Sequence, residues 1–355
     1  MIRATLCIDD AVGEHRRALL DPFGKPFRLE VERWSERGRR AKLDEIWWGR
    51  VKARMPGNRG WFVDLGLDRD GIIEQSKAQA IAEGAMLAVR VKSEAWAEKG
   101  LVLSLADMSP SVPRPDKPQL HQPPADDLFL RGVVVVATLR EEAGRAQVEG
   151  AIVESGQQVV GLEGGGDLAI QASRAMTVID VDAAERVGAQ DADAFALDLN
   201  LAAAEEAARQ ISLRGIGGLL AVDFVGMKQS KHQRAVAEAF RKALAGWLGR
   251  ASEVLELSQL GVCEAAIARR ARPVRDALSA PAHEREALDA LREIESAGWT
   301  ARGSKIRARV SQEAAGWLET DHIGWGQALA DRIGARWTLE PQDRPPGRAE
   351  VWSTE

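Results

Sequence analysis

Two short apolar runs that each carry an aspartate close to the C-terminal end, joined by one long helical segment, constrain the fold of this chain most. The first run covers residues 176–181 and overlaps the stretch TVIDVDA, and the second covers 219–224, within LLAVDFVGM. Between them, residues 191–213 place apolar side chains at helical spacing, and Gly215 can end the helix. Helices that alternate with apolar strands are typical of an α/β unit.

The aspartates of these runs predict a site. If the two strands are neighbours in one sheet, Asp180 and Asp223 emerge at the same edge, where ligands bind in open α/β sheets. Asp182 follows on the same face as Asp180. Converging carboxylates repel each other, and Mg²⁺, which takes one or two carboxylates and keeps several waters, would relieve this. It could then activate a water and hold a phosphate oxygen, as phosphodiester hydrolysis requires. A structural alternative is that Asp180 caps a turn and Asp223 pairs with Lys228 or Lys231.

The segment after the second aspartate is basic. KQSKHQR contributes Lys228, Lys231 and Arg234 near the start of a helix predicted from about 231 to 249. Helix N-termini attract phosphate groups, so these cations favour an anionic ligand there. His232 in the same segment fits either an acid–base role or a capping or packing role.

Composition excludes several classes of protein. The chain has 355 residues, 45% hydrophobic and 28% charged, which is an ordinary globular balance with room for two or three domains. No apolar run approaches the roughly 20 residues of a membrane span, and MIRATLCIDD meets acid too early for a signal-peptide core. Two cysteines, Cys7 and Cys263, provide neither a disulfide framework nor a cysteine-based zinc cage. We therefore expect a cytoplasmic protein.

One region is basic although the net charge is −5. Residues 33–59 contain nine Lys or Arg and three acids, with Trp47, Trp48 and Trp61 inside or beside the region. Cations among aromatic rings suit phosphate neutralisation and base stacking. The alternatives are a solvated hairpin face for the charges and core packing for the tryptophans.

Short strand-like runs fill much of the remaining chain. Five of them between residues 46 and 105 predict a small closed barrel of OB type. A proline-rich stretch, 107–127, is predicted to be a linker, and strand-like runs follow at 132–139 and within 150–182. Further on we expect a strand at EVLELS, a helix at GVCEAAIARRAR, and a separate small α+β unit over residues 282–355.

Over about 165–275 the sequence resembles the RNase E/G family of endoribonucleases. GGDLAIQASRAMTVIDVDAA is similar to the family strand with its TIDVN motif, and LNLAAAEEAARQISLRGIGGLLAVDFVGM, KHQRAV and LSQLGVCEAAIARRAR continue the similarity collinearly. RGWFVDLGLDRDGIIE resembles the family's OB-fold (S1-type) RNA-binding barrel. The last part, 282–355, is similar to the family's small C-terminal domain.

The resemblance implies an activity and its residues. Family members cut single-stranded RNA internally with Mg²⁺, for which Mn²⁺ is the alternative ion, and leave a 5′-phosphate. Their two metal-binding aspartates match Asp180 and Asp223, and Asp182 stands at a third position that is usually Asn. That change would either tighten metal binding or misplace the ion.

The resemblance also implies RNA contacts. In the barrel, the RNA-stacking aromatic matches Phe62, a lysine contact matches Lys99, and the second aromatic position is Ile72. We expect Trp61, Phe62 and Lys99 to grip single-stranded RNA. Lys231 and Arg234 would stabilise the developing phosphate charge.

Two family features are absent. The cysteine pair that forms a zinc link between subunits should fall near 276–283, where the chain reads DALSAPAH. No zinc and no zinc-linked dimer are therefore expected, and the oligomeric state stays open. Between 107 and 166 there is no equivalent of the Arg-Thr pair that senses an RNA 5′-monophosphate, so sensing of the 5′ end is in doubt.

We accordingly expect a multidomain α+β and α/β fold with five parts. An RNase H-like part covers residues 1–45, an OB-fold barrel is inserted at 46–106, and a linker with the remaining RNase H-like and reduced sensor region covers 107–166. A DNase I-like catalytic domain covers 167–280, and a small α+β domain covers 281–355.

The sequence thus supports two functions. The first is a Mg²⁺-dependent endoribonuclease, in which a water activated by the metal attacks phosphorus during RNA processing or decay. The second is a non-catalytic RNA-binding protein on a degenerate nuclease scaffold, motivated by the lost sensor, the lost zinc link, Ile72 and Asp182. Other phosphodiester chemistry, such as DNA cleavage, or a structural role completes the set.

Overall fold

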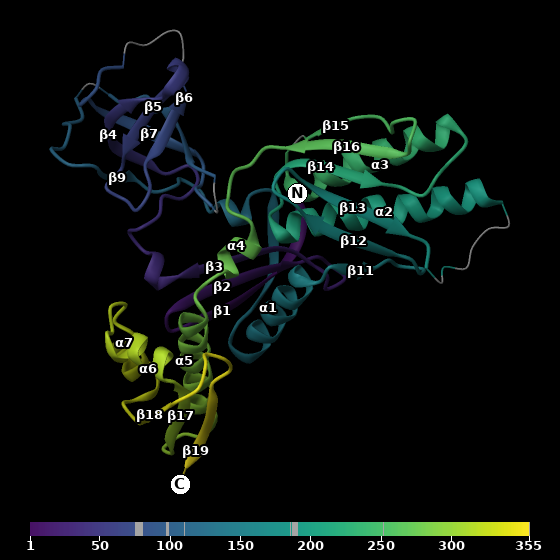
Figure 1. Ribbon diagram of the computed structural model, residues 1–355. Helices are drawn as coiled ribbons and strands as arrows, with labels where there is room; N and C mark the ends of the chain where they lie inside the picture. The colour runs from purple at the N-terminus through teal and green to yellow at the C-terminus, as the bar shows by residue number, and fades with distance from the viewer. Residues whose placement is uncertain are drawn as a thin grey trace.

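The fold is mixed α+β and is seen in a computed structural model that describes residues 1–74, 81–96, 99–109, 111–184, 186, 191–250 and 252–354. Its described parts form four β-sheets with helices packed on three of them, and the barrel stands apart from the rest (Figure 1). Short 3-10 turns lie at Trp34–Glu36, Pro56–Asn58 and Leu128–Leu130. No described helix combines the length and the apolar character that a bilayer span requires.

The N-terminal sheet has the order β10-β1-β2-β3, with β10 parallel to β1 and the other pairs antiparallel. Its elements are β1 (Ile2–Ala11), β2 (Glu14–Leu20), β3 (Pro26–Arg33), β10 (Val133–Leu139) and the covering helix α1 (Glu141–Gly156). The helix approaches the sheet closely at Gly144, where a Cβ atom would lie 2.5 Å from the carbonyl oxygen of Ile8. The strand-like interpretation of 150–156 is therefore wrong, because this stretch ends α1.

The five predicted strands at 46–105 are confirmed and close into a barrel. They are β4 (Ile46–Arg54), β5 (Gly60–Asp64), β6 (Gly71–Glu74), β7 (Met86–Ser93) and β8 (Leu101–Leu105). The order is β5-β6-β8-β7-β4, and β4 also pairs with β5. This closure is consistent with an OB-type fold. The proline-rich stretch adds a sixth strand, β9 (Gln119–Gln122), on β4, so it is more than a linker.

The largest core lies under a six-stranded sheet of order β11-β12-β13-β14-β16-β15. Its strands are β11 (Val159–Gly161), β12 (Asp167–Ala172), β13 (Met176–Asp182), β14 (Gly218–Asp223), β15 (Glu253–Val254) and β16 (Val262–Ile267). Only β13 and β14 run parallel, and all other pairs are antiparallel. The helices α2 (Ala192–Arg214) and α3 (Ser230–Leu248) cover one face (Figure 1), where Ile179 and Leu220 are buried.

One predicted helix in this region is wrong. The segment GVCEAAIARRAR contains the strand β16 and no helix. Its alanines favour a helix, but Cys263, Ala265 and Ile267 alternate with more exposed neighbours, so they bury one face of a strand paired with β14. Tertiary pairing therefore overrides local propensity. The expected strand at EVLELS is confirmed only over Glu253–Val254.

Residues 282–354 contain the helices and strands that the sequence predicts for a small α+β unit. It contains α5 (Ala282–Thr300), β17 (Lys305–Ser311), α6 (Gln312–Glu319), α7 (Trp325–Ile333), β18 (Trp337–Gln342) and β19 (Glu350–Thr354), preceded by α4 (Val274–Leu278). The three strands form a sheet of order β18-β17-β19 that packs on α5.

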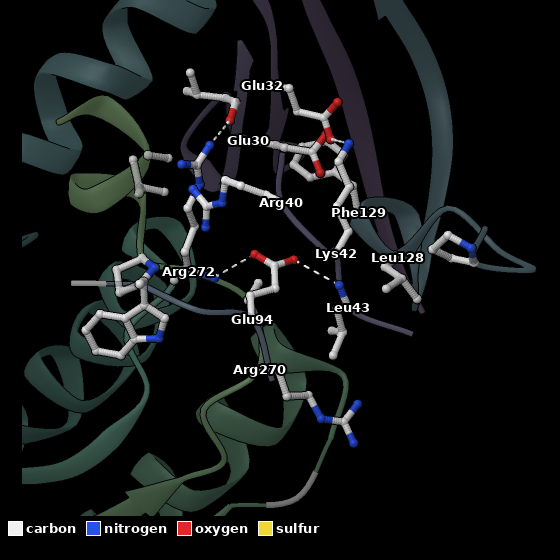
Figure 2. Close-up of a pocket in the computed structure, with 18 of the residues that line it drawn as sticks. Glu30, Glu32, Arg40, Lys42, Leu43, Glu94, Leu128, Phe129, Arg270 and Arg272 are labelled. Atoms are coloured by element: carbon white, nitrogen blue, oxygen red, sulfur yellow. Dashed lines mark hydrogen bonds and ion pairs between the residues drawn. The ribbon is translucent and has the colours of Figure 1, made fainter. Parts of the chain in front are cut away.

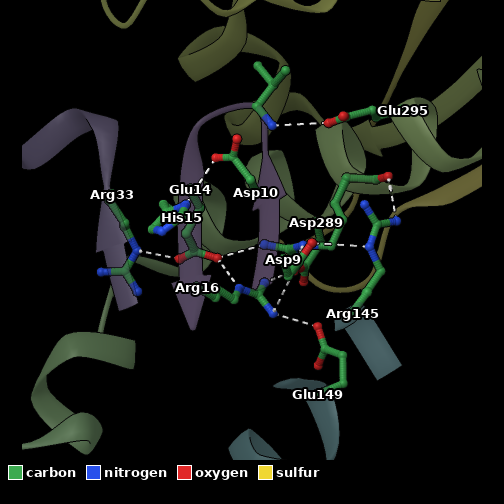
Figure 3. A network of polar contacts seen from close by, with 12 residues as sticks. Asp9, Asp10, Glu14, His15, Arg16, Arg33, Arg145, Glu149, Asp289 and Glu295 are labelled. Atoms are coloured by element: carbon green, nitrogen blue, oxygen red, sulfur yellow. Dashed lines mark hydrogen bonds and ion pairs between the residues drawn. The ribbon is translucent and has the colours of Figure 1, made fainter. Parts of the chain in front are cut away.

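A buried ionic network joins this unit to the N-terminal sheet (Figure 3). On the sheet, Asp9 lies on β1, and Glu14 and Arg16 lie on β2. The Glu14 Oε2 atom accepts hydrogen bonds from Arg16 Nε at 2.5 Å and from Arg292 Nη2 of α5 at 2.6 Å. The Asp9 carboxylate accepts from Arg292 Nε and from Arg145 Nε of α1, each at 3.2 Å. The N-terminal sheet, α1 and α5 therefore meet at the carboxylates of Asp9 and Glu14.

Charge balance decides the protonation of this network. Burial by itself would raise the pKa of Glu14, but the charges of Arg16, Arg292 and Arg33 outweigh it and lower the pKa below 4.5. A carboxyl whose pKa is lower in the folded state adds stability above its unfolded pKa and loses it as pH falls through the folded pKa. The network should therefore weaken in acid.

We expect the substitution Glu14→Ala to lower the free energy of unfolding by about 3–5 kcal/mol, because it leaves buried guanidinium groups without their anion. Urea denaturation at neutral pH measures this. The matched control is Glu340→Ala, which removes the partly exposed partner of the exposed Arg307 and Arg309 side chains and should cost less than about 1 kcal/mol. Equal losses in the two variants would contradict the role of the network.

Candidate functional site

The two strand-end aspartates lie side by side. β13 and β14 are parallel neighbours, and their register pairs Asp180 with Asp223 directly. Both residues are exposed, on the face of the sheet opposite α2 and α3. Adjacent strands are about 4.8 Å apart, so the prediction that both carboxylates emerge together is confirmed.

These two carboxylates have no partner among the residues that the structure describes. Within the described ranges, neither carboxylate forms a hydrogen bond or an ion pair. The structure therefore shows no ion pair between Asp223 and Lys228 or Lys231, all of which lie in these ranges. Among the described residues, no group of three or more His, Cys, Asp or Glu side chains is arranged to hold a metal. Two carboxylates on exposed strand ends nevertheless suit Mg²⁺, which takes one or two of them and completes its octahedron with water.

Asp182 is placed differently from the pair. It lies opposite Asp167 of β12, one row beyond Asp180, and its Oδ1 accepts a hydrogen bond from the backbone N–H of Ala184 at 2.6 Å. Its carboxylate therefore caps the turn that follows β13. The turn-capping role that the sequence left open for Asp180 belongs to Asp182 in the structure.

Helix α2 holds the loop after β14 through a residue that the sequence did not single out. The fully buried Asn200 donates from Nδ2 to the carbonyl oxygen of Val225 at 2.7 Å, and its Oδ1 accepts from the Val225 N–H at 3.0 Å. This bidentate contact fixes the backbone two residues after Asp223. A single amide inside a run of alanine and leucine is the sequence signal that could have revealed it.

A second contact from α2 fixes the start of α3. Asp193 accepts a hydrogen bond from the Lys228 N–H at 2.5 Å and lies 2.6 Å from His232 Nδ1. The Lys228 N–H and the His232 contact lower the pKa of Asp193. The imidazole of His232 is thus oriented by the carboxylate of Asp193. Lys231 and Arg234 are exposed on the first turn of α3, whose N-cap, Gln229, provides no side-chain hydrogen bond.

The barrel residues fall on two faces of β5. Phe62 is partly exposed, and its cross-strand partner is Ile72. Trp61 is 8% exposed and faces the barrel interior, with the Arg54 guanidinium carbon 5.0 Å from its ring centroid. Lys99 is partly exposed and pairs with Trp96 in an isolated bridge. The geometry therefore places Phe62 and Ile72 together on the outer face and Trp61 away from them.

A cleft of about 940 Å³ lies between the barrel on one side and the N-terminal and six-stranded sheets on the other. Cationic side chains line much of this cleft. Glu94, at the end of β7, spans the cleft (Figure 2). One carboxylate oxygen accepts from the Leu43 N–H and the other from the Arg272 N–H, each at 3.1 Å. The Glu94 N–H donates to the Arg270 carbonyl oxygen at 2.7 Å. This residue therefore fastens the barrel to the segment after β16.

The substitution Asn200→Ala should lower the free energy of unfolding by about 1–3 kcal/mol, because the Val225 N–H and carbonyl lose their partner. Urea denaturation gives the loss, and hydrogen exchange of the Val225 amide should become faster. Gln327→Ala, which removes one exposed contact to Asp331, is the control. Unchanged exchange at Val225 would contradict the anchoring role.

The contacts of the Glu94 carboxylate with the Leu43 and Arg272 N–H groups should depend on pH. Burial raises the pKa of Glu94 from 4.5 to about 7, although the Leu43 N–H and nearby Arg40 and Lys42 oppose this. Because the folded chain holds this proton more tightly than the unfolded chain, the stability that the Glu94 carboxyl contributes is fully present below pH 4.5 and is lost as pH rises towards 7.

We therefore predict that Glu94→Gln, which stays neutral, gains stability relative to the unsubstituted protein between pH 5 and pH 7.5. Urea midpoints at several pH values measure the difference, with exposed Glu83→Gln as the control. A difference independent of pH would show that Glu94 does not titrate in this range.

Comparison with known proteins identifies the region around the paired aspartates. Residues 133–270 match the model of the Ribonuclease E/G family. Ribonuclease E of Escherichia coli (strain K12) is 36% identical over 118 residues, which are 33% of this chain and 11% of that protein. Ribonuclease E of Nostoc sp. (strain PCC 7120) is also 36% identical over 118 residues, 33% of this chain and 17% of that protein.

Ribonuclease G of Escherichia coli (strain K12) is 34% identical over 97 residues, 27% of this chain and 20% of that protein. The matches thus span between a tenth and a fifth of the length of these relatives. The family match covers both β13 and β14 with their terminal aspartates. Over residues 133–270, the part of the chain that contains the paired aspartates is thus similar to the Ribonuclease E/G family.

Proposed function

We propose that this chain is an endoribonuclease that cuts single-stranded RNA with the help of Mg²⁺ and leaves a 5′-phosphate, in RNA processing or decay. The observation that carries the proposal is the pairing of Asp180 with Asp223 inside the region that matches the family. Both carboxylates are exposed, and neither has a partner among the described residues. The names of the relatives, ribonuclease E and ribonuclease G, support the substrate class.

Asp180 and Asp223 would hold the ion, for which Mn²⁺ is the alternative. When bound there, Mg²⁺ supplies Lewis-acid chemistry, because it lowers the pKa of a water and offsets the charge of a phosphate oxygen. In the reaction, the oxygen of water bonds to phosphorus and the bond to the 3′-oxygen breaks. The upstream fragment gains a 3′-hydroxyl, and the downstream fragment keeps the phosphate.

Other residues of the chain position the substrate in this proposal. Lys231 and Arg234, exposed on the first turn of α3, neutralise phosphates, and the N–H groups of that turn add to their field. Asp182 orients the metal's surroundings through the turn that it caps. Phe62 and Lys99 contact RNA on the outer face of the barrel, while Trp61 acts from beneath by supporting the strand.

The domain assignment is part of the same proposal. We assign residues 1–45 and 107–166 to an RNase H-like unit around the N-terminal sheet, 46–106 to an S1-type barrel, 167–280 to a DNase I-like domain and 281–355 to the small C-terminal domain. We further propose a cytoplasmic location and assembly without a zinc link.

A second function, RNA binding without cleavage, is favoured by one observation. Asp182 stands where the family usually has Asn, and its carboxylate is engaged in the turn after β13. If the third polar position is needed for catalysis, the scaffold would bind RNA and leave it intact.

Cleavage of a 5′-labelled, unstructured RNA with Mg²⁺ or with EDTA separates these functions. We expect internal cuts that need Mg²⁺ and that fall by on the order of 10² or more in Asp180→Asn and in Asp223→Asn. Glu253→Gln removes an exposed carboxylate elsewhere on the same sheet and should cut normally. Wild-type rates in Asp223→Asn would refute the assigned site, and tight binding of RNA that stays intact would favour the second function.

The salt dependence of RNA binding tests the basic residues. Each phosphate contact to a single strand contributes about −0.7 to the slope of log affinity against log salt. The double variant Lys231→Ala with Arg234→Ala should therefore flatten the slope by about 1.4 if both residues contact phosphates. Exposed Arg302→Ala serves as the control, and an unchanged slope would remove both residues from the interface.

A further inference from the structure

An apolar surface continues from the carboxylate pair along the uncovered face of the six-stranded sheet. The register pairs Val178 with Ala221 in the row next to Asp180 and Asp223, and Met176 with Leu219 in the row beyond. Val178 is 39% exposed and Leu219 is 53% exposed. We call Met176, Val178, Leu219 and Ala221 the apolar strip.

Strand periodicity explains why these side chains face outward. Alternate residues of β13 and β14 point to opposite faces, and Ile179 and Leu220, between the strip residues, are buried under the helices. Polar residues flank the first row of the strip, with Gln171 on β12 opposite Val178 and Glu264 on β16 opposite Ala221. In the second row, Ala266 of β16 lies opposite Leu219. The strip is therefore two strands wide, with polar neighbours beside the row next to the carboxylates.

The position of the strip favours one occupant. We propose that the apolar strip holds the bases of the nucleotides next to the scissile phosphate, an inference that rests on the proposed ribonuclease function. An exposed apolar patch with a polar rim marks an interaction site. The apolar strip begins two residues along the strand from the carboxylates, which is a distance of about 7 Å. A nucleotide whose phosphate lies at Asp180 and Asp223 can therefore place its base on Val178.

The spacing of the rows favours single-stranded RNA over a duplex. Two residues of strand advance about 7 Å, which is twice the ~3.4 Å spacing of stacked bases along one strand. Bases on Val178 and on Met176 are therefore unstacked from each other, as single strands allow and duplexes do not. The strip has no hydrogen-bonding side chain, so it binds the faces of the bases without choosing among them.

A second copy of the chain fits the strip less well. A standard protein interface takes about 20–30 residues from each side, whereas the strip offers four side chains. Two exposed carboxylates also lie at its end, and they suit a metal-bound phosphate better than an apolar partner surface.

The test compares base-bearing and abasic RNA. Cuts made by the unsubstituted protein in an unstructured RNA are mapped first, and the same RNA is then synthesised with one abasic residue on either side of the mapped bond. Leu219→Ser and Val178→Ser should each lower kcat/KM on the base-bearing RNA by about fivefold to tenfold, the scale of losing one base contact.

On the RNA that lacks the contacting base, the same substitutions should have little further effect, because the contact is already gone. Val136→Ser, an exposed valine on β10, is the matched control and should change neither substrate. Equal losses on both RNAs would reveal a structural effect and overturn the proposal, as would no loss on either.

Binding without cleavage keeps this test separate from the proposed function. In EDTA, fluorescence anisotropy gives the affinity for the same oligoribonucleotide and for a fully abasic strand of equal length. Weaker binding of only the base-bearing strand by Leu219→Ser supports the strip even if no RNA is cut. A dimer that dissociates in Leu219→Ser, seen by sedimentation, would assign the strip to a second copy and overturn the proposal.

Discussion

The parallel pairing of β13 with β14 is the constraint on which the site depends. Because the strands run in the same direction, their last residues meet at one edge, and Asp180 lies directly beside Asp223. An antiparallel pair would have placed the two aspartates at opposite ends. The crossover helix α2 enforces the direction, and its Asn200 and Asp193 hold the two segments that follow β14. The same helix therefore builds the fold and places the carboxylates.

This arrangement brings two like charges side by side in the free protein. Two exposed carboxylates on neighbouring strands repel each other, and the surrounding side chains do nothing to relieve the repulsion within the described residues. Sites of this kind keep stability low locally in exchange for affinity for a cation. The buried network around Glu14 shows the opposite solution, in which arginines from β2, α1 and α5 together compensate the carboxylates of Glu14 and Asp9. The carboxylates of Glu14 and Asp9 thus stabilise the packing between parts of the chain, whereas those of Asp180 and Asp223 stay available to a ligand.

The sequence predicted the parts of the structure whose signal is local. The five barrel strands, the helices after Asp191 and Ser230, and the two aspartates at strand ends follow from periodicity and turn residues. It failed at GVCEAAIARRAR because alanines favour a helix in isolation, while the pairing of β16 with β14 comes from residues about 40 positions away. The inward direction of Trp61 and the turn-capping role of Asp182 also depend on register, which no single run of residues encodes.

The account stands on the claim that Asp180 and Asp223 form one cation site. Mn²⁺ bound to protein loses its solution electron paramagnetic resonance signal, so titration of the free ion measures occupancy directly and without RNA. We predict that the unsubstituted protein binds one Mn²⁺ per chain that Mg²⁺ displaces, and that Asp180→Asn and Asp223→Asn each abolish this binding. Equal Mn²⁺ binding by all three proteins would show that the ion lies elsewhere and would contradict the account.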